Sequence, residues 1–202
     1  MNVTERFLKY VSFHTTSDED SQTTPSSACQ LELGKYLAQE LADIGLEDAH
    51  MDEFGRVYAY LPASADCAEL ENIGFVAHMD TSPDASGENI KPRIIRYEGG
   101  DIVLSEGIVT SVKEFPFLDS LVGKELIITD GTTLLGADDK AGVAEIVTLC
   151  EYLAENPDVS HRGIAVCFTP DEEIGCGADH FNFEKFKAKK AYTVDGGELG
   201  EI

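Results

Sequence analysis

The sequence has little positive charge, no long apolar run and no secretion signal, and each absence removes a class of protein. Only 15 lysines and arginines stand against 38 aspartates and glutamates in 202 residues, a net charge of −23. That charge repels nucleic-acid phosphates and anionic lipids, so we expect no nucleic acid and no membrane as partner. No apolar run approaches a bilayer span, and the N-terminus MNVTERFLKY lacks the apolar stretch of a signal peptide. We therefore expect a soluble, acidic, cytoplasmic protein.

Paired cysteines and several common catalytic motifs are also absent. The five cysteines are scattered and include no C-x-x-C pair, so we expect neither a disulfide framework nor a zinc finger. The sequence contains no H-E-x-x-H, no G-x-S-x-G and no G-x-x-x-x-G-K-[ST], which excludes the common zincins, serine hydrolases and P-loop nucleotide sites. Apolar residues make up 43% of the chain, which is typical of a globular protein with the length of one domain.

The periodicity of apolar residues predicts an α/β fold. Helices are expected over 3–13, 28–46, 140–156 and 178–188, with Ser26 or Ser27 capping the second helix and Gly45 closing it. Strands are expected over 49–54, 56–63, 72–80, 92–97, 101–106, 124–130, 163–170 and 189–197. The last two read as strands buried on both faces. The alternation from Leu126 to Val194 predicts a central, mostly parallel mixed sheet flanked by helices, in one domain without a linker.

Acidic residues gather where four apolar runs end. These positions are His78 and Asp80, Asp138 and Asp139, Glu172 and Glu173, and Asp195. Functional residues of α/β sheets collect at the carboxyl ends of strands, so we expect the four groups to converge on one edge. His78 and Asp80 lie two residues apart and point to the same side of an extended strand, which suits an imidazole held by a carboxylate.

Each group also has an ordinary structural interpretation: a surface histidine, a helix cap, a solvated acidic turn, or a turn aspartate before glycine. Together, however, the carboxylates would repel one another unless cations neutralise them. One histidine with several carboxylates suits a divalent metal, zinc above all, with manganese or cobalt as alternatives. A neighbouring acid that is not a ligand could then accept a proton from water.

Four stretches resemble a known family: GFVAHMDTSPDASGENIKP, LLGADDKAGVAEI, CFTPDEEIGCGADHF and AYTVDGG. They resemble the peptidase T family of tripeptide aminopeptidases, within the zinc-exopeptidase superfamily that includes carboxypeptidase G and aminoacylase. The superfamily pattern is H-x-D, then D-x-K-[GA]-G, then E-E, then a later D. The resemblance covers essentially the whole chain and implies that residues 1–202 are the N-terminal part of a zinc-exopeptidase catalytic domain, which is therefore incomplete.

The resemblance implies two zinc ions. Their ligands here would be His78, Asp138, Glu173 and Asp195. Asp138 would bridge the two ions, and its neighbour Asp139 would not be a ligand.

The resemblance also implies catalytic roles. Asp80 would orient His78, and Glu172 would be the general base that takes a proton from the attacking water and passes it to the leaving amine. The family's further histidine ligand, and its lid domain for closure and dimerisation, have no counterpart in these residues. His161 and His180 match no motif, and we expect both at the surface, His180 within a helix.

The function implied is a metal-dependent aminopeptidase that removes the N-terminal residue from short peptides, with tripeptides as substrates and a homodimer as the full-length form. The 202-residue chain itself would be an inactive or weakly active fragment. Two alternatives stay open: a non-catalytic zinc-binding fragment, and a related dipeptidase or acyl-amino-acid deacylase.

Overall fold

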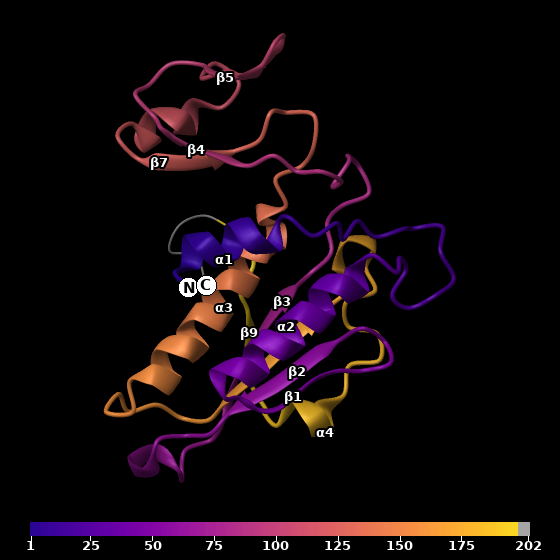
Figure 1. Ribbon diagram of the computed structural model, residues 1–202, viewed down its shortest axis with the longest axis vertical. Coiled ribbons are helices and arrows are strands. Elements are labelled where there is room, and N and C mark those ends of the chain that lie inside the picture. Colours follow the sequence, from indigo (N-terminus) through magenta and orange to yellow (C-terminus); the bar gives the residue numbers. More distant parts are fainter. Residues whose placement is uncertain (198–202) are drawn as a thin grey trace.

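The computed structural model describes residues 1–197; residues 198–202, which follow the last predicted strand, lie outside the described residues. The chain forms an α/β body and a smaller lobe, residues 93–128, which Figure 1 shows set apart from the helices α1, α2 and α3 of the body.

The body is built on a five-stranded sheet. In spatial order its strands are β1 (Glu47–Met51), β2 (Val57–Leu61), β8 (Ile164–Thr169), β3 (Ile73–His78) and β9 (Ala191–Thr193). The pairings β1–β2 and β2–β8 are antiparallel, whereas β8–β3 and β3–β9 are parallel. The predicted mixed α/β sheet is confirmed, with equal numbers of parallel and antiparallel pairings rather than a parallel majority.

Within residues 1–197, four α-helices accompany the sheet: α1 (Val3–Tyr10), α2 (Gln30–Ile44), α3 (Ala137–Glu155) and α4 (Phe183–Phe186). In the described part of the chain, none of them combines the length and apolar character needed to cross a bilayer. Gly45 ends α2 in the left-handed conformation, as predicted, with φ of 101°. The predicted serine caps are wrong, because α2 begins at Gln30 and the Ser26 hydroxyl is hydrogen-bonded to Asp171 instead.

The helix predicted over 178–188 is reduced to the single turn of α4. His180 has a positive φ of 58°, so the chain cannot pass through it as a helix, and Lys187 ends α4 with φ of 54°. Asn182 caps this turn through the backbone N–H groups of Glu184 and Lys185. Phe186, the last residue of α4, packs onto the sheet.

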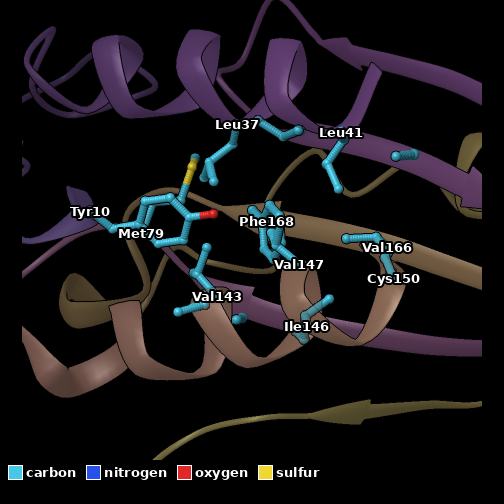
Figure 2. Packing of buried hydrophobic residues seen from close by; sticks show 14 of the residues in the cluster. Tyr10, Leu37, Leu41, Met79, Val143, Ile146, Val147, Cys150, Val166 and Phe168 are labelled. Atoms are coloured by element: carbon cyan, nitrogen blue, oxygen red, sulfur yellow. The ribbon is translucent and has the colours of Figure 1, made fainter. Parts of the chain in front are cut away.

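The main core lies between the sheet and the helices α1, α2 and α3. Figure 2 shows Leu37 and Leu41 of α2 and Val143 and Val147 of α3 meeting around Phe168 of β8. Every residue of β8 is buried, as its continuous apolar run predicts. On the other face, a smaller cluster joins sheet residues to the irregular segment after β8; it comprises Tyr58, Ala165, Cys167 and Phe186.

The lobe contains two antiparallel strand pairs and a 3-10 helix, Pro116–Leu121. The strand pairs are formed by β4 (Arg93–Arg96) with β7 (Glu125–Ile128), and by β5 (Ile102–Ser105) with β6 (Ile108–Thr110). The prediction that β7 joins the central sheet is therefore wrong. Leu126 and Ile128 pack into the lobe's own cluster around Tyr97, while Ile127 packs against the main core. Both faces of β7 therefore make apolar contacts, although β7 does not pair with any strand of the central sheet.

The strand β9 also departs from expectation. It was predicted to be buried on both faces, but all three of its residues are exposed. Within residues 1–197, β9 pairs on one side only, with β3, so it forms the edge of the sheet.

Truncating the fully buried Phe168 should destabilise the body strongly. We expect Phe168→Ala to lower the free energy of unfolding by about 3–5 kcal/mol, because it opens a cavity at the centre of the core. Urea denaturation followed by circular dichroism measures this difference. The matched control is Phe183→Ala, whose ring is 77% exposed and whose loss should cost less than about 0.5 kcal/mol. Equal effects of the two substitutions would contradict the assignment of the core.

Candidate metal centre

His78 lies at the centre of the carboxylate cluster. It is the last residue of β3, and its side chain is 2% exposed. Its Nε2 atom lies 2.8 Å from Oδ1 of Asp138, and 3.8 Å from both Oε2 of Glu172 and Oδ2 of Asp195. Acids from three separate parts of the chain thus surround one nitrogen of one imidazole.

The fully buried Asp80 joins His78 to the acidic turn that follows β8. Its Oδ1 atom lies 3.3 Å from Nδ1 of His78, the ring nitrogen that does not face Asp138. Its two carboxylate oxygens accept the backbone N–H groups of Glu172, at 3.0 Å, and Glu173, at 3.1 Å. One carboxylate therefore fixes the imidazole and the turn relative to each other.

Strand ends supply three of the four groups, as expected. His78 ends β3, the turn Glu172–Ile174 follows β8, and Asp195 comes two residues after β9. The parallel ladder continues to the neighbour of Asp195, because the Val194 N–H donates to the Val76 carbonyl at 2.8 Å. The carboxyl ends of adjacent strands thus reach the same edge of the sheet.

The fourth group has a different origin from the one predicted. Asp138 and Asp139 stand in the first turn of α3, not at a strand end, since the preceding strand β7 belongs to the lobe. Gly142 lets the start of α3 come close to the segment after β9: a β-carbon at Gly142 would lie 2.0 Å from the carbonyl oxygen of Val194. The absence of a side chain at Gly142 lets α3 lie directly against the segment that carries Asp195.

Asp139 lies deeper in the cluster than the sequence indicated. Its side chain is buried, and its Oδ2 atom accepts the backbone N–H of His78 at 3.2 Å. Potential ligand atoms of His78, Asp139 and Asp195 lie within 4.8 Å of one another, and so do those of His78, Asp138 and Glu173. All four predicted ligands therefore meet around His78, with Asp139 as an additional neighbour.

The donor set fits a divalent cation. One imidazole nitrogen with several carboxylate oxygens is the combination found in catalytic zinc sites, and manganese and cobalt accept similar ligands. His78, Asp138, Glu173 and Asp195 could hold such ions, and Asp80 on the second ring nitrogen is the partner that metal-binding histidines commonly have.

The electrostatics of the centre also favour a cation. Burial alone would lower the pKa of His78, but its hydrogen bond with Asp80 and the charges of Asp80 and Asp139 outweigh burial and raise that pKa to about 10. Burial and the charge of Asp195 raise the pKa of Asp139 to about 8. Burial and the charge of Asp138 raise the pKa of Glu173. The metal-free centre therefore retains protons to offset its negative charge.

Sequence reasoning assigned no role to two buried charged residues beside the centre. Asp171, next to Glu172, accepts hydrogen bonds from Ser26 and Gln30. Lys140, two residues after Asp138, is fully buried, and its Nζ atom donates to the Phe13 carbonyl at 2.9 Å; burial lowers its pKa to about 8. The available signal was adjacency, since each lies within two residues of a predicted site residue.

Neither His161 nor His180 belongs to the groups of potential ligands around His78. His180 is exposed, as expected, and stacks on Phe54 with ring centroids 4.0 Å apart. His161 is partly exposed, and its Nδ1 atom lies 3.0 Å from the Arg162 carbonyl oxygen.

No family model matches the chain, but individual known proteins do. Peptidase T of Caldanaerobacter subterraneus subsp. tengcongensis is 57% identical over 203 residues, which cover 99% of this chain and 49% of that protein. Peptidase T of Clostridium acetobutylicum is 54% identical over 203 residues, which cover 99% of this chain and 50% of that protein. The chain spans about half the length of the curated relatives it matches.

Solved structures show the same likeness. Aminopeptidase PepT from Bacillus cereus superposes with a TM-score of 0.66 at 27% identity, covering 96% of this chain and 43% of that one. A tripeptidase from Staphylococcus aureus superposes with a TM-score of 0.67 at 25% identity, and the match covers 97% of this chain and 43% of that one. These matches confirm the predicted fold class.

Binding of a divalent ion to this centre should release protons. Because the raised pKa values of His78 and Asp139 leave the metal-free centre protonated at pH 7, an ion must displace protons to bind. We therefore expect the apparent affinity for Zn²⁺ to rise between pH 6 and pH 8, as fewer protons compete. Calorimetry in buffers of different ionisation enthalpy measures the release directly.

The control for this titration is His161→Ala, which leaves the cluster intact and should bind as the unmodified chain does, whereas His78→Ala should weaken binding and reduce the coupled proton release. A binding heat that is independent of buffer, with an affinity independent of pH, would contradict this description of the centre.

Proposed function

Since the chain belongs to the peptidase T family, we propose that it carries metal ligands and the proton-transfer group of an aminopeptidase that acts on short peptides. One observation carries the proposal: His78, Asp138 and Glu173 present ligand atoms within 4.8 Å of one another, with Asp195 on the same imidazole. Relatives named peptidase T, at 52–57% identity, support the peptidase activity. The activity, substrate and partners of the longer protein are part of this proposal.

We assign the metal ligands as His78, Asp138, Glu173 and Asp195. Zinc is the proposed ion, two per complete site, with cobalt or manganese as alternatives. Asp138 is the bridging ligand in this assignment. Asp139 is left out of the ligand set in this assignment, as the resemblance implies, and its Oδ2 atom accepts the His78 backbone N–H.

When bound, such ions supply Lewis acidity, which polarises the scissile carbonyl and makes water more acidic. Glu172 is suited to take the proton of the attacking water, since its side chain is 52% exposed and reaches within 3.8 Å of His78. The same carboxyl then returns the proton to the leaving amine. Asp80 holds the imidazole of His78 in the orientation that directs Nε2 towards the cluster.

The proposed substrates are tripeptides. The relatives named peptidase T and the structural neighbour described as a tripeptidase favour them over dipeptides and acyl-amino acids. A related dipeptidase or deacylase is the second candidate within the enzyme class, and the rates of tripeptide and acyl-amino-acid hydrolysis by the same preparation discriminate between them.

Residues 1–202 are, in this proposal, the N-terminal part of one catalytic domain, and further chain as found in the relatives completes it with a lid and the second-zinc histidine. The exposed strand β9 and the length of the relatives support this assignment. A homodimer is the proposed form of the longer protein, and a cytoplasmic location stays a prediction of the sequence.

The activity test uses Glu172→Gln in a protein of the relatives' full length. We expect hydrolysis of a tripeptide to fall at least about a hundredfold, because the variant cannot accept a proton, while zinc binding stays within about threefold. The matched control is Glu145→Gln, an exposed glutamate on α3, which should retain full activity.

Two results would change the assignment. Unchanged hydrolysis by Glu172→Gln would remove Glu172 as the proton acceptor. Zinc binding that depends on His78, with no hydrolysis of any peptide by the full-length protein, would favour a non-catalytic metal-binding function.

Completion of the domain has its own test. If further chain covers β9, the backbone N–H groups of Ala191 and Thr193 should exchange with solvent at least about tenfold more slowly in the full-length protein than in residues 1–202 alone. Hydrogen exchange read by mass spectrometry measures this. Equal exchange rates in the two proteins would contradict the proposed completion at this edge.

A further inference from the structure

The polar N-terminal segment runs beside the metal centre and contacts three of its parts. We call this segment, residues 13–30, the N-terminal strap. The strap lies parallel to the chain after β3: the Thr81 N–H donates to the Thr15 carbonyl at 3.2 Å, and the Ser17 N–H donates to the Thr81 carbonyl at 3.1 Å. Thr81 directly follows Asp80, so the strap begins at the imidazole side of the centre.

The second contact is with the start of α3. The buried Lys140 donates from Nζ to the carbonyl oxygen of Phe13 at 2.9 Å. Asp138 and Asp139 immediately precede Lys140, so the strap also limits where the first turn of α3 can lie.

The third and most extensive contact is with the acidic turn. The carboxylate of Asp171 accepts the backbone N–H of Ser26 at 2.8 Å, the Ser26 hydroxyl at 2.6 Å and Nε2 of Gln30 at 2.7 Å. Gln30 is also an acceptor, because its Oε1 atom takes the Asp171 N–H at 3.2 Å. Ser26, Gln30 and Asp171 are all buried.

These hydrogen bonds hold Asp171 in a conformation that costs energy. Its φ of 60° is left-handed, a region that most residues with a β-carbon avoid and that aspartate enters more readily than they do. Its buried carboxylate is offset by these neutral donors, each bond to a charged group being stronger than an ordinary one. The backbone then turns directly into Glu172 and Glu173.

We propose that Ser26 and Gln30 are positioning residues, which fix Glu172 and Glu173 in the centre by holding Asp171. The inference rests on the proposed function, in which Glu173 is a metal ligand and Glu172 accepts a proton. The turn is held on one side by Asp80, through the N–H groups of Glu172 and Glu173, and on the other by the strap. His78 and Asp195 are placed by β3 and β9, which do not depend on the contact between Ser26 and Asp171.

The first test needs no metal. In Ser26→Ala, we expect the amide protons of Glu172 and Glu173 to exchange about tenfold faster, because the turn opens more often when Asp171 loses a bond. The amide protons of β8 should keep their rates, which separates positioning of the turn from general destabilisation. Thr23→Ala is the matched control, since it removes an exposed hydroxyl of the same strap that does not contact Asp171.

The second test uses Co²⁺ alone as a spectroscopic probe. We expect Ser26→Ala and Asp171→Asn each to weaken Co²⁺ binding by about tenfold and to change its visible absorption spectrum, with the double variant no worse than the more severe single one. Thr23→Ala should leave affinity and spectrum unchanged. Unchanged exchange and an unchanged spectrum in Ser26→Ala would overturn the role of the strap.

The two proposals fail in different ways. If the unmodified chain binds no Co²⁺, the proposed function fails, and the exchange rates of Glu172 and Glu173 still decide the strap. If the unmodified chain binds Co²⁺ through His78 but Ser26→Ala matches it in exchange and spectrum, only the strap is wrong.

Discussion

A concentration of carboxylates around one buried imidazole is the constraint on which the rest of this structure depends. Asp138, Glu172 and Asp195 all approach Nε2 of His78, while Asp80 holds the other side of the ring. Such a group of acids is tolerated only when protons or a cation offset its charge. A protein with a net charge of −23 offers few neighbouring bases for this purpose, and Lys140, the base nearest in sequence, donates to a backbone carbonyl instead. A divalent ion is the occupant that we propose.

Much of the fold could be predicted because its patterns are local. The continuous apolar run of β8, the helical spacing in α3 and the glycine that ends α2 each determine one element within a few residues. The partner of a strand is not local. The sequence of β7 would suit a strand of the central sheet and a strand of the lobe equally well. Only the structure shows that β7 pairs with β4, with Leu126 and Ile128 packed in the lobe.

The centre was predictable for a related reason. His78, Glu172 and Asp195 follow strands that lie side by side, so a rule about strand ends brings them together before any distance is known. The supports of the centre escaped that rule. Ser26 looked like a helix cap, yet its hydroxyl is used by Asp171, a residue 145 positions away in the chain. A hydrogen bond between residues so far apart produces no pattern that a single sequence would reveal. The buried position of Asp139 is equally non-local, because it depends on how closely α3 approaches β9.

The position of a bound ion tests the central claim most directly. Crystals of the chain soaked with Zn²⁺ and measured at the zinc absorption edge would show the ion by its anomalous scattering. The account predicts a peak at about 2.0–2.2 Å from Nε2 of His78 and from a carboxylate oxygen of Asp138. Zinc bound only elsewhere on the acidic surface, with His78 still hydrogen-bonded to Asp138, would contradict it.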